Sequence, residues 1–211
     1  YRPTGESGDF EKANFPIGVE GGKTSTCPTQ NLMEAYDMKD GTPFVWNNQS
    51  DPYDNRDPRM KYTIVCNEMK WPVDPVEIWE GGTNGLPLQN ATTTGYYLKK
   101  YVNNTISFEA GSTVTKKQHN WVLFRYGEIL LNYAEAMINA FHDPNYKDAV
   151  YNMSAREAVN QIRGRTNISL PGFPSDITEK DFVKRLKNER RVELAFEGHR
   201  FWDVRRWKEL G

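Results

Sequence analysis

Apolar and polar positions follow their most regular pattern near the end of the chain, in EKDFVKRLKNERRVELAFEGHRFWDVRRW (residues 179–207). Thr178 followed three positions later by Asp181 has the spacing of a capping box, which marks the start of a helix. Gly198 is a typical residue to follow a helix end. We therefore expect one helix from residue 179 to Gly198 and a second over residues 199–210.

One face of the first predicted helix mixes apolar and charged residues. At 100° per residue, Phe182, Leu186 and Phe196 share that face. The same arc also carries four charged residues, Glu189, Arg190, Glu193 and Glu197. Charges that point toward a core are tolerated only when they are paired there. The pattern predicts a structural ion-pair network, to which we assign Glu189, Arg190, Glu193, Glu197, Arg200 and Arg205.

The acidic residues of this face also allow a catalytic interpretation. Glu189 and Glu193, and likewise Glu193 and Glu197, are four residues apart, so their carboxylates could approach the ~5 Å separation used by retaining glycosidases. We favour the structural interpretation, because these residues lie among helix-packing positions and the planar guanidinium of arginine suits buried carboxylates. The arginines available for this pairing are Arg163, Arg165, Arg190, Arg200, Arg205 and Arg206.

Further helical patterns precede this segment. The run from Trp121 to Phe141 has apolar stripes on two nearly opposite sides, which predicts a helix sandwiched between neighbours. The first stripe comprises Val122, Tyr126, Ile129, Leu130, Tyr133, Met137 and Ala140, and the second comprises Phe124, Leu131 and Ile138. Ser154 and Glu157 form a capping box before a third helix. Successive helices joined by short turns favour tetratricopeptide-like hairpins.

The amino-terminal half has little regular patterning. Residues 1–26 are expected to form a loop, residues 28–41 a short helix capped by Thr29, and residues 51–59 a series of turns. Strands are expected over residues 61–66 and 96–102. We predict a mainly α fold in two parts: a loop-rich, partly β, ligand-facing region over residues 1–117, and a helical scaffold over residues 118–211.

Composition narrows the possible partners. The chain has 211 residues, with 27 basic and 28 acidic side chains and a net charge of −1. This balance implies neither nucleic acid nor an anionic membrane as a partner. No apolar run reaches membrane length, and no metal or cofactor motif is present. Cys27 and Cys66 could form a disulfide, but we favour two buried thiols.

Four blocks carry a family resemblance. PTQNLMEAYDMKDG, YDNRDPRMKYTIV, RYGEILLNYAEA with AREAVNQIRGRTN, and ERRVELAFEGHRFWDVRRW occur in this order, and together they resemble the carboxy-terminal portion of the SusD/RagB family. The resemblance implies a non-catalytic glycan-binding lipoprotein of the bacterial outer-membrane surface, working with a SusC-like TonB-dependent transporter. It also implies a lipid anchor and amino-terminal hairpins that this sequence does not contain.

Candidate glycan-binding residues follow from composition alone, because aromatic rings stack on sugar faces and amides or acids reach the hydroxyls. The candidates are Trp46 with Asn47 and Asn48, Trp71, and Trp79 with Glu80. Core burial is the competing interpretation for each tryptophan, and it is the one we favour for Trp121, Trp202 and Trp207. A helical scaffold for protein interaction and a glycoside hydrolase remain as alternative functions.

Overall fold

The computed structural model describes residues 2–46 and 51–209. It contains two compact units, the first comprising Tyr1–Glu34 and Met60–Val122 and the second comprising Ala35–Arg59 and Leu123–Gly211. Ala35–Arg59 thus belongs with the carboxy-terminal helices, although it precedes the predicted boundary at residue 117. The division of roles between a ligand-facing part and a scaffold stays a prediction.

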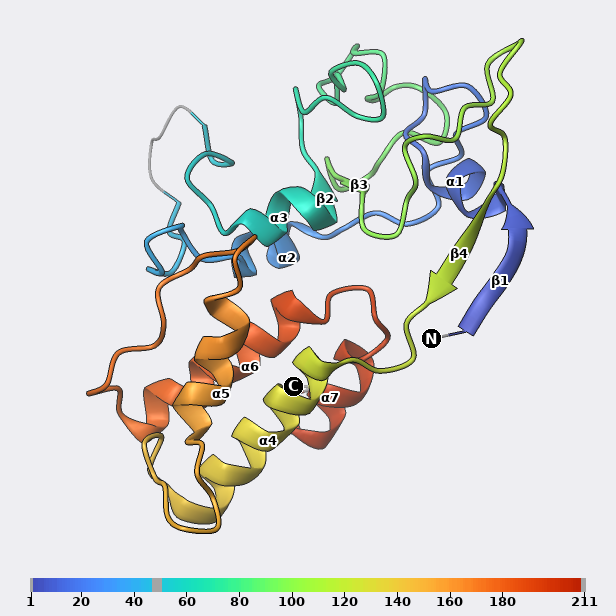
Figure 1. Cartoon of the computed structure of the whole chain (residues 1–211). Coiled ribbons are helices and arrows are strands. Elements are labelled where there is room, and N and C mark those ends of the chain that lie inside the picture. The colour runs from blue at the N-terminus through green and yellow to red at the C-terminus, as the bar shows by residue number, and fades with distance from the viewer. Residues whose placement is uncertain (1, 47–50, 210–211) are drawn as a thin grey trace. The chain divides into compact units, whose positions relative to one another are not determined.

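The carboxy-terminal part of the second unit is a group of helices, shown from yellow to red in Figure 1. It contains α4 (Tyr126–Phe141), α5 (Ala155–Arg163), α6 (Glu179–Glu193) and α7 (Arg200–Arg206). Helix α4 packs against both α5 and α6. Leu131, Ala158 and Phe182 are fully buried in the shared core. The bundle therefore forms because each helix turns an apolar stripe toward the others.

Two of the predicted helix starts are confirmed. The Ser154 hydroxyl accepts from the Glu157 backbone N–H at 3.1 Å, and the Glu157 carboxylate accepts from the Ser154 N–H at 2.8 Å, which completes a capping box before α5. The Thr178 hydroxyl accepts from the Asp181 backbone N–H at 3.1 Å at the start of α6. Both caps satisfy backbone donors that a helix cannot pair internally.

Three predicted helix limits are wrong. Helix α4 begins at Tyr126, because Lys117–Trp121 is a strand and Arg125 has an extended backbone. Helix α6 ends at Glu193 instead of Gly198, and Phe196 follows with a φ of 61°. This left-handed backbone cannot continue a right-handed helix. Helix α7 is also shorter than expected and covers only Arg200–Arg206.

The sandwich predicted for α4 is also wrong for this chain. Leu130, Leu131, Ala134, Met137 and Ile138 are buried. By contrast, Phe124, Tyr126 and Ile129 are 70%, 67% and 49% exposed. The helix therefore buries one side and leaves apolar side chains of the other side in solvent.

The first unit is organised by two small antiparallel sheets. Strand β1 (Arg2–Ser7) pairs with β4 (Lys117–Trp121), and Glu6 lies opposite Gln118 in that sheet. Strand β2 (Ile64–Val65) pairs with β3 (Tyr97–Leu98). Residues 1–26, expected to be a loop, instead contain β1 and helix α1 (Asp9–Asn14). The sequence did not reveal β1 because its partner strand lies more than a hundred residues away.

The central elements are shorter than predicted. Helix α2 (Gln30–Ala35) confirms the short helix, and the Thr29 hydroxyl accepts from the Leu32 backbone N–H at 3.2 Å. Helix α3 (Pro58–Thr63) occupies part of the segment expected to be a strand, since proline is well tolerated in the first turn of a helix. Only Ile64–Val65 and Tyr97–Leu98 are extended within the two predicted strands.

Side chains hold the irregular loops in place. The Asn84 side chain donates to the Ile17 carbonyl at 2.6 Å and accepts from the Glu77 backbone N–H at 2.9 Å. Asn67 accepts from the Ile78 backbone N–H at 2.8 Å. These bonds replace the regular ladders that such loops lack. Cys27 and Cys66 are not joined by a disulfide, so that alternative is wrong; Cys66 is buried as expected, whereas Cys27 is only partly buried.

No helix among the described residues combines the length and the apolar character needed to cross a lipid bilayer.

Candidate functional site

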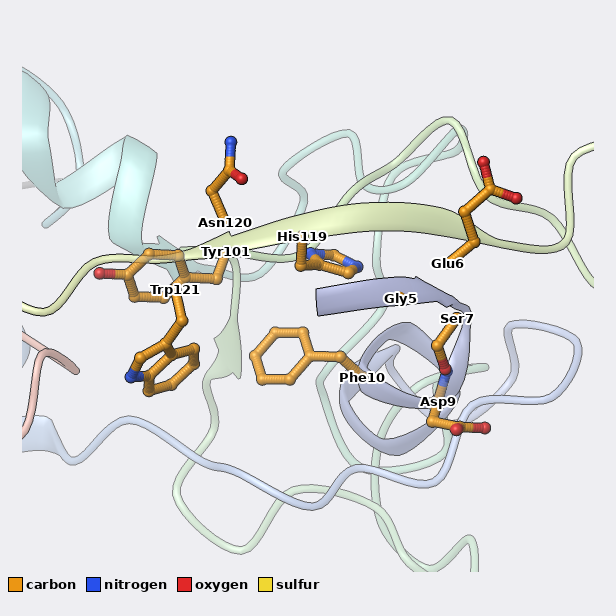
Figure 2. Close-up of a pocket in the computed structure, with 9 residues that line it drawn as sticks. All are labelled: Gly5, Glu6, Ser7, Asp9, Phe10, Tyr101, His119, Asn120 and Trp121. Atoms are coloured by element: carbon orange, nitrogen blue, oxygen red, sulfur yellow. The ribbon is translucent and has the colours of Figure 1, made fainter. Parts of the chain in front are cut away.

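An aromatic pocket of about 390 Å³ lies beside the sheet of β1 and β4 in the first unit. Figure 2 shows its lining residues, which come from β1, α1, β4 and the segment that follows β3. They are Gly5, Glu6, Ser7, Asp9, Phe10, Tyr101, His119, Asn120 and Trp121. The lining combines aromatic rings with a few polar groups, which is typical of a site for small ligands.

The alternation of β4 sets which side chains face the pocket rings. His119 and Trp121 lie on one side of the strand, and Asn120 points to the other side (Figure 2). The Tyr101 ring stacks on Trp121 with 5.5 Å between centroids and an interplanar angle of 27°. Trp121 nevertheless remains 47% exposed. The pair thus offers a broad aromatic surface to solvent.

The backbone of Tyr101 is unusual. Its φ is 68°, in the left-handed region that bulky residues rarely adopt. Such a conformation costs on the order of 1–3 kcal/mol and is found preferentially at functional sites. Tyr101 thus combines a left-handed backbone with a ring stacked on Trp121.

A buried carboxylate supports the pocket from behind. Glu11 in α1 is fully buried. It accepts from the Asn103 backbone N–H at 2.9 Å, and its other oxygen lies 3.1 Å from His119 Nε2. His119 in turn lies 5.9 Å from Phe10 between ring centroids. Glu11 therefore fixes the orientation of the His119 ring that lines the pocket.

The predicted glycan-binding residues fall in both units. Trp46, in the second unit, is 51% exposed and meets Phe44 edge-on at 5.2 Å between centroids. Asn47 and Asn48 lie outside the described residues. Trp79, in the first unit, is 47% exposed beside the exposed Glu80. A binding role for these residues stays a prediction.

Trp71 corrects part of that prediction. It is only 6% exposed, with the Lys99 ammonium 5.0 Å from its ring centroid. A buried ring has no face to offer to a sugar, so core burial is the correct interpretation for Trp71. The opposite correction applies to Trp121 and Trp202, which were expected in the core but are 47% and 66% exposed.

The pocket rings themselves were missed. Phe10 lies in the segment expected to be a loop, and Trp121 was placed in a helix. The alternation of KQHNW would have been the signal for a strand with His119 and Trp121 on one face. Five residues are too few to outweigh the stronger helical period that follows.

The ion-pair network predicted for α6 is present in the second unit. The Arg59 guanidinium donates to Asp57 at 2.7 Å, to Glu189 at 2.5 Å and to Glu193 at 2.8 Å. Arg163 donates to Glu189 at 2.7 Å. Glu189 is thus shared by two arginines, and both of its oxygens are used.

The Glu193 carboxylate pairs with three arginines. It accepts from Arg59 at 2.8 Å, from Arg125 at 2.6 Å and from Arg165 at 2.8 Å. Arg125 also reaches Glu197 at 2.7 Å. The pairing links the first turn of α3, the N-cap of α4 and the segment after α5 to the end of α6.

A second group of ion pairs surrounds Arg190. Its guanidinium donates to Asp203 in α7 at 2.8 Å and to Asn132 in α4 at 2.7 Å. Arg206 also pairs with Asp203, at 3.0 Å. These contacts join α4, α6 and α7. Arg190, Glu189, Glu193 and Glu197 are therefore correctly assigned.

Arg200 and Arg205 are wrongly assigned to this network. Both are exposed, and neither forms an ion pair within the described part of the chain. Arg205 lies over the Phe201 ring instead, at 4.0 Å from the centroid. Their places are taken by Arg59 and Arg125, which the helical pattern of α6 could not identify because they are distant in sequence.

The acids of the network are held ionised. Burial raises the pKa of Glu193, but the charges of Arg59 and Arg125 outweigh burial and lower that pKa to about 2. Burial likewise opposes ionisation of Glu189, whose pKa is lowered by Arg59 and Arg163. A retaining glycosidase needs one carboxyl that stays protonated. Neither acid fits that role.

Asp37 is the exception among the acids near Arg163. Burial raises its pKa to about 6, although Arg163 and Arg185 act in the opposite direction. The Asp37 carboxylate lies 3.5 Å from Arg163 and 3.7 Å from Arg185, longer than the bonds of Glu189 and Glu193.

The described residues contain no cluster of three or more His, Cys, Asp or Glu side chains suited to a metal ion.

Comparison with known proteins identifies the family. The profile of the SusD family matches residues 4–210. A SusD-like protein P38 of Formosa agariphila is 37% identical over 91 residues, which cover 40% of this chain and 16% of that protein.

Two solved structures of SusD-like proteins are similar to this chain. A Bacteroides fragilis protein described as a SusD-like carbohydrate binding protein has a TM-score of 0.79 and 27% identity, over 96% of this chain and 39% of its own. Another SusD-like protein of the same species has a TM-score of 0.75 and 27% identity, over 95% and 40% respectively. The chain thus spans about two fifths of the length of these solved relatives. It shares their fold and belongs to the SusD family.

Proposed function

We propose that this chain is part of a non-catalytic glycan-binding protein, and that the aromatic pocket beside β4 contributes to its binding site. The observation that carries the proposal is the stacked pair of Tyr101 and Trp121 at the pocket, in which Trp121 is half-exposed and Tyr101 has a left-handed backbone. Exposed rings of this kind suit the apolar faces of sugars. A solved relative is itself described as carbohydrate binding.

Polar groups around the rings supply the second requirement of a glycan site. Ser7, Asn120 and the carboxylates of Glu6 and Asp9 line the same pocket. Hydroxyls of a sugar can donate to the oxygens of Ser7 and Asp9, which lie nearer the rings than Glu6 and Asn120 do. Ring stacking would then provide buried area, and the hydrogen bonds would set orientation.

The family supports a wider proposal for the full protein. We infer a surface lipoprotein of the bacterial outer membrane that delivers glycan to a SusC-like TonB-dependent transporter. Tetratricopeptide-like pairing of α4 with α5 is part of the same proposal. Co-purification of the full-length protein with such a transporter is the test, and absence of the complex under mild detergent would contradict this partner.

Binding is tested with two tryptophan variants. Trp121→Ala should weaken binding of a recognised polysaccharide about tenfold or more in calorimetry, since a stacked ring contributes at least ~1.4 kcal/mol. Trp202→Ala is the matched control, because that ring is 66% exposed but lies in the second unit. Equal affinity of both variants and the wild type would contradict the proposed site.

The hydrolase alternative needs a different readout. The chain is incubated with each oligosaccharide that it binds, and the products are analysed. We expect no cleavage, because both carboxylate oxygens of Glu189 and of Glu193 accept hydrogen bonds from arginines. Cleavage products that disappear in a Glu189→Gln variant would restore the catalytic interpretation.

A further inference from the structure

We propose that Glu11 is a positioning residue of the pocket beside β4, because its one buried carboxylate joins the three segments that carry the pocket rings. The inference rests on the proposed function, since it concerns the same rings. It assigns Glu11 a role in glycan affinity, although this side chain does not line the cavity itself.

Two of the three segments meet at Glu11 through the chain itself and one hydrogen bond. Glu11 directly follows Phe10 in α1. Its carboxylate accepts from the Asn103 backbone N–H at 2.9 Å, two residues after Tyr101. The carboxylate therefore connects the helix that carries the Phe10 ring to the segment that carries the Tyr101 ring.

The third segment is β4. The Glu11 carboxylate lies 3.1 Å from Nε2 of His119, and His119 and Trp121 project from the same side of the strand (Figure 2). A carboxylate only accepts hydrogen bonds, so the Nε2 nitrogen carries the proton that joins the two side chains. The contact thus holds β4 by the face that presents Trp121 to the pocket.

Regular hydrogen bonding does not connect the Tyr101 segment to β4. Strand β4 pairs with β1, and β3 pairs with β2. Among the residues that the structure describes, no backbone hydrogen bond joins residues 99–106 to Lys117–Trp121. The Glu11 carboxylate therefore supplies a link between these two segments that the sheets do not.

Burial makes this link strong. Glu11 is completely shielded from solvent, and hydrogen bonds to a carboxylate are about twice as strong as those between neutral groups. Without the carboxylate, the Asn103 N–H and the His119 ring lose their shared acceptor. We then expect the two segments to separate and the stack of Tyr101 on Trp121 to loosen.

The first test follows the ring of Trp121 directly. The chain is labelled with 5-fluorotryptophan, and the Trp121 and Trp71 signals in the fluorine NMR spectrum are identified by their loss in Trp121→Phe and Trp71→Phe. In Glu11→Met, which keeps the volume but removes the acceptor, the Trp121 signal should shift or broaden. The Trp71 signal, from the core of the first unit, should stay in place. Glu11→Gln keeps an oxygen that accepts from Asn103, so it should restore the Trp121 signal.

The second test measures affinity. The wild type and both Glu11 variants are compared in affinity gel electrophoresis with laminarin, xyloglucan, galactomannan, chitosan and alginate. For a polysaccharide that retards the wild type, Glu11→Met should bind about tenfold more weakly, and Glu11→Gln should recover most of this loss. Glu20→Ala, at an exposed site of the first unit, is the control and should bind as the wild type does.

Several results would overturn the positioning role. An unmoved Trp121 signal or wild-type affinity in Glu11→Met is enough, even if that variant is less stable. The role also fails if Glu11→Gln restores neither readout, because hydrogen bonds to Glu11 would then not explain the effect. If the Trp71 signal moves as well, Glu11→Asp, which shortens the side chain by one methylene, takes the place of Glu11→Met with the same expectations.

Failure of the proposed function would be distinguishable from failure of this inference. If no polysaccharide retards the wild type, the proposed function is contradicted. The fluorine spectra of the Glu11 variants need no ligand, so they still decide whether Glu11 positions the Trp121 ring.

Discussion

The Arg59 guanidinium lies 2.5 Å from Glu189, a residue 130 positions further along the chain, and both side chains are almost completely buried. The same guanidinium reaches Glu193 one helical turn later, at 2.8 Å. A buried charge of this kind is stable only while its partners are present. The contact therefore ties Ala35–Arg59 to the carboxy-terminal helices of the second unit.

Removal of the shared acid should destabilise the fold. In Glu193→Ala, Arg59, Arg125 and Arg165 lose a common partner. We expect the free energy of unfolding to fall by about 3–5 kcal/mol in urea denaturation. Lys184→Ala, at an exposed position of the same helix, should change it by less than about 0.5 kcal/mol. A large loss of glycan affinity at unchanged stability would contradict this structural role.

Stability should depend on the protonation of Asp37. Its pKa in the fold, about 6, lies above the ordinary value of 3.8, so the fold favours the neutral form. The contribution of Asp37 to the free energy of unfolding therefore increases as the pH falls from about 6 toward 4, and decreases as the pH rises through this range. The opposite holds for Glu193, whose stabilising charge is present above about pH 4.5 and is lost as the pH falls toward 2.

The Asp37→Asn variant isolates this effect. Its free energy of unfolding, relative to wild type, should increase by on the order of 3 kcal/mol between pH 4 and pH 7. Urea denaturation at several pH values measures the difference. Asp176→Asn, at an exposed site, is the control. If the difference in free energy of unfolding between Asp37→Asn and wild type stays constant from pH 4 to pH 7, the pKa of Asp37 is not raised in the fold.

Substitutions of Tyr101 should change the free energy of unfolding and the glycan affinity independently. Tyr101→Gly removes the ring but also relieves a φ of 68°, so we expect it to be more stable than Tyr101→Ala by about 1 kcal/mol. Both variants should bind glycan about tenfold more weakly than wild type. Asn90→Gly, at another left-handed position (φ 66°), is the control and should retain binding. Equal stability of the glycine and alanine variants would show that the backbone is not strained.

The two loop tryptophans should respond differently. Trp71→Ala creates a cavity in the first unit and should cost about 3–5 kcal/mol. Trp79→Ala removes a half-exposed ring and should leave stability within about 0.5 kcal/mol of wild type. Thermal denaturation of both variants distinguishes them. If Trp71→Ala proved as stable as wild type and lost glycan affinity, the burial of Trp71 would no longer explain its role.

Sequence alone located the helices of the second unit well. The caps at Ser154 and Thr178 and the inward face of α6 are local features, encoded within a few residues of each other. The buried acids Glu189 and Glu193 were also predictable, because helical periodicity places them beside Phe182 and Leu186. The family resemblance rested on these same blocks, and the match over residues 4–210 confirms it.

The partners of those acids and the walls of the pocket depended on the tertiary structure. Arg59 reaches Glu189 across 130 residues, and Arg2 lies opposite Trp121 in the β1–β4 sheet. Such contacts join segments with no shared period, so no local pattern distinguishes Arg59 from the exposed Arg200, or Trp121 from the buried Trp71. Local interactions determine where helices start and which faces are apolar, whereas burial and long-range pairing are determined only by the tertiary fold.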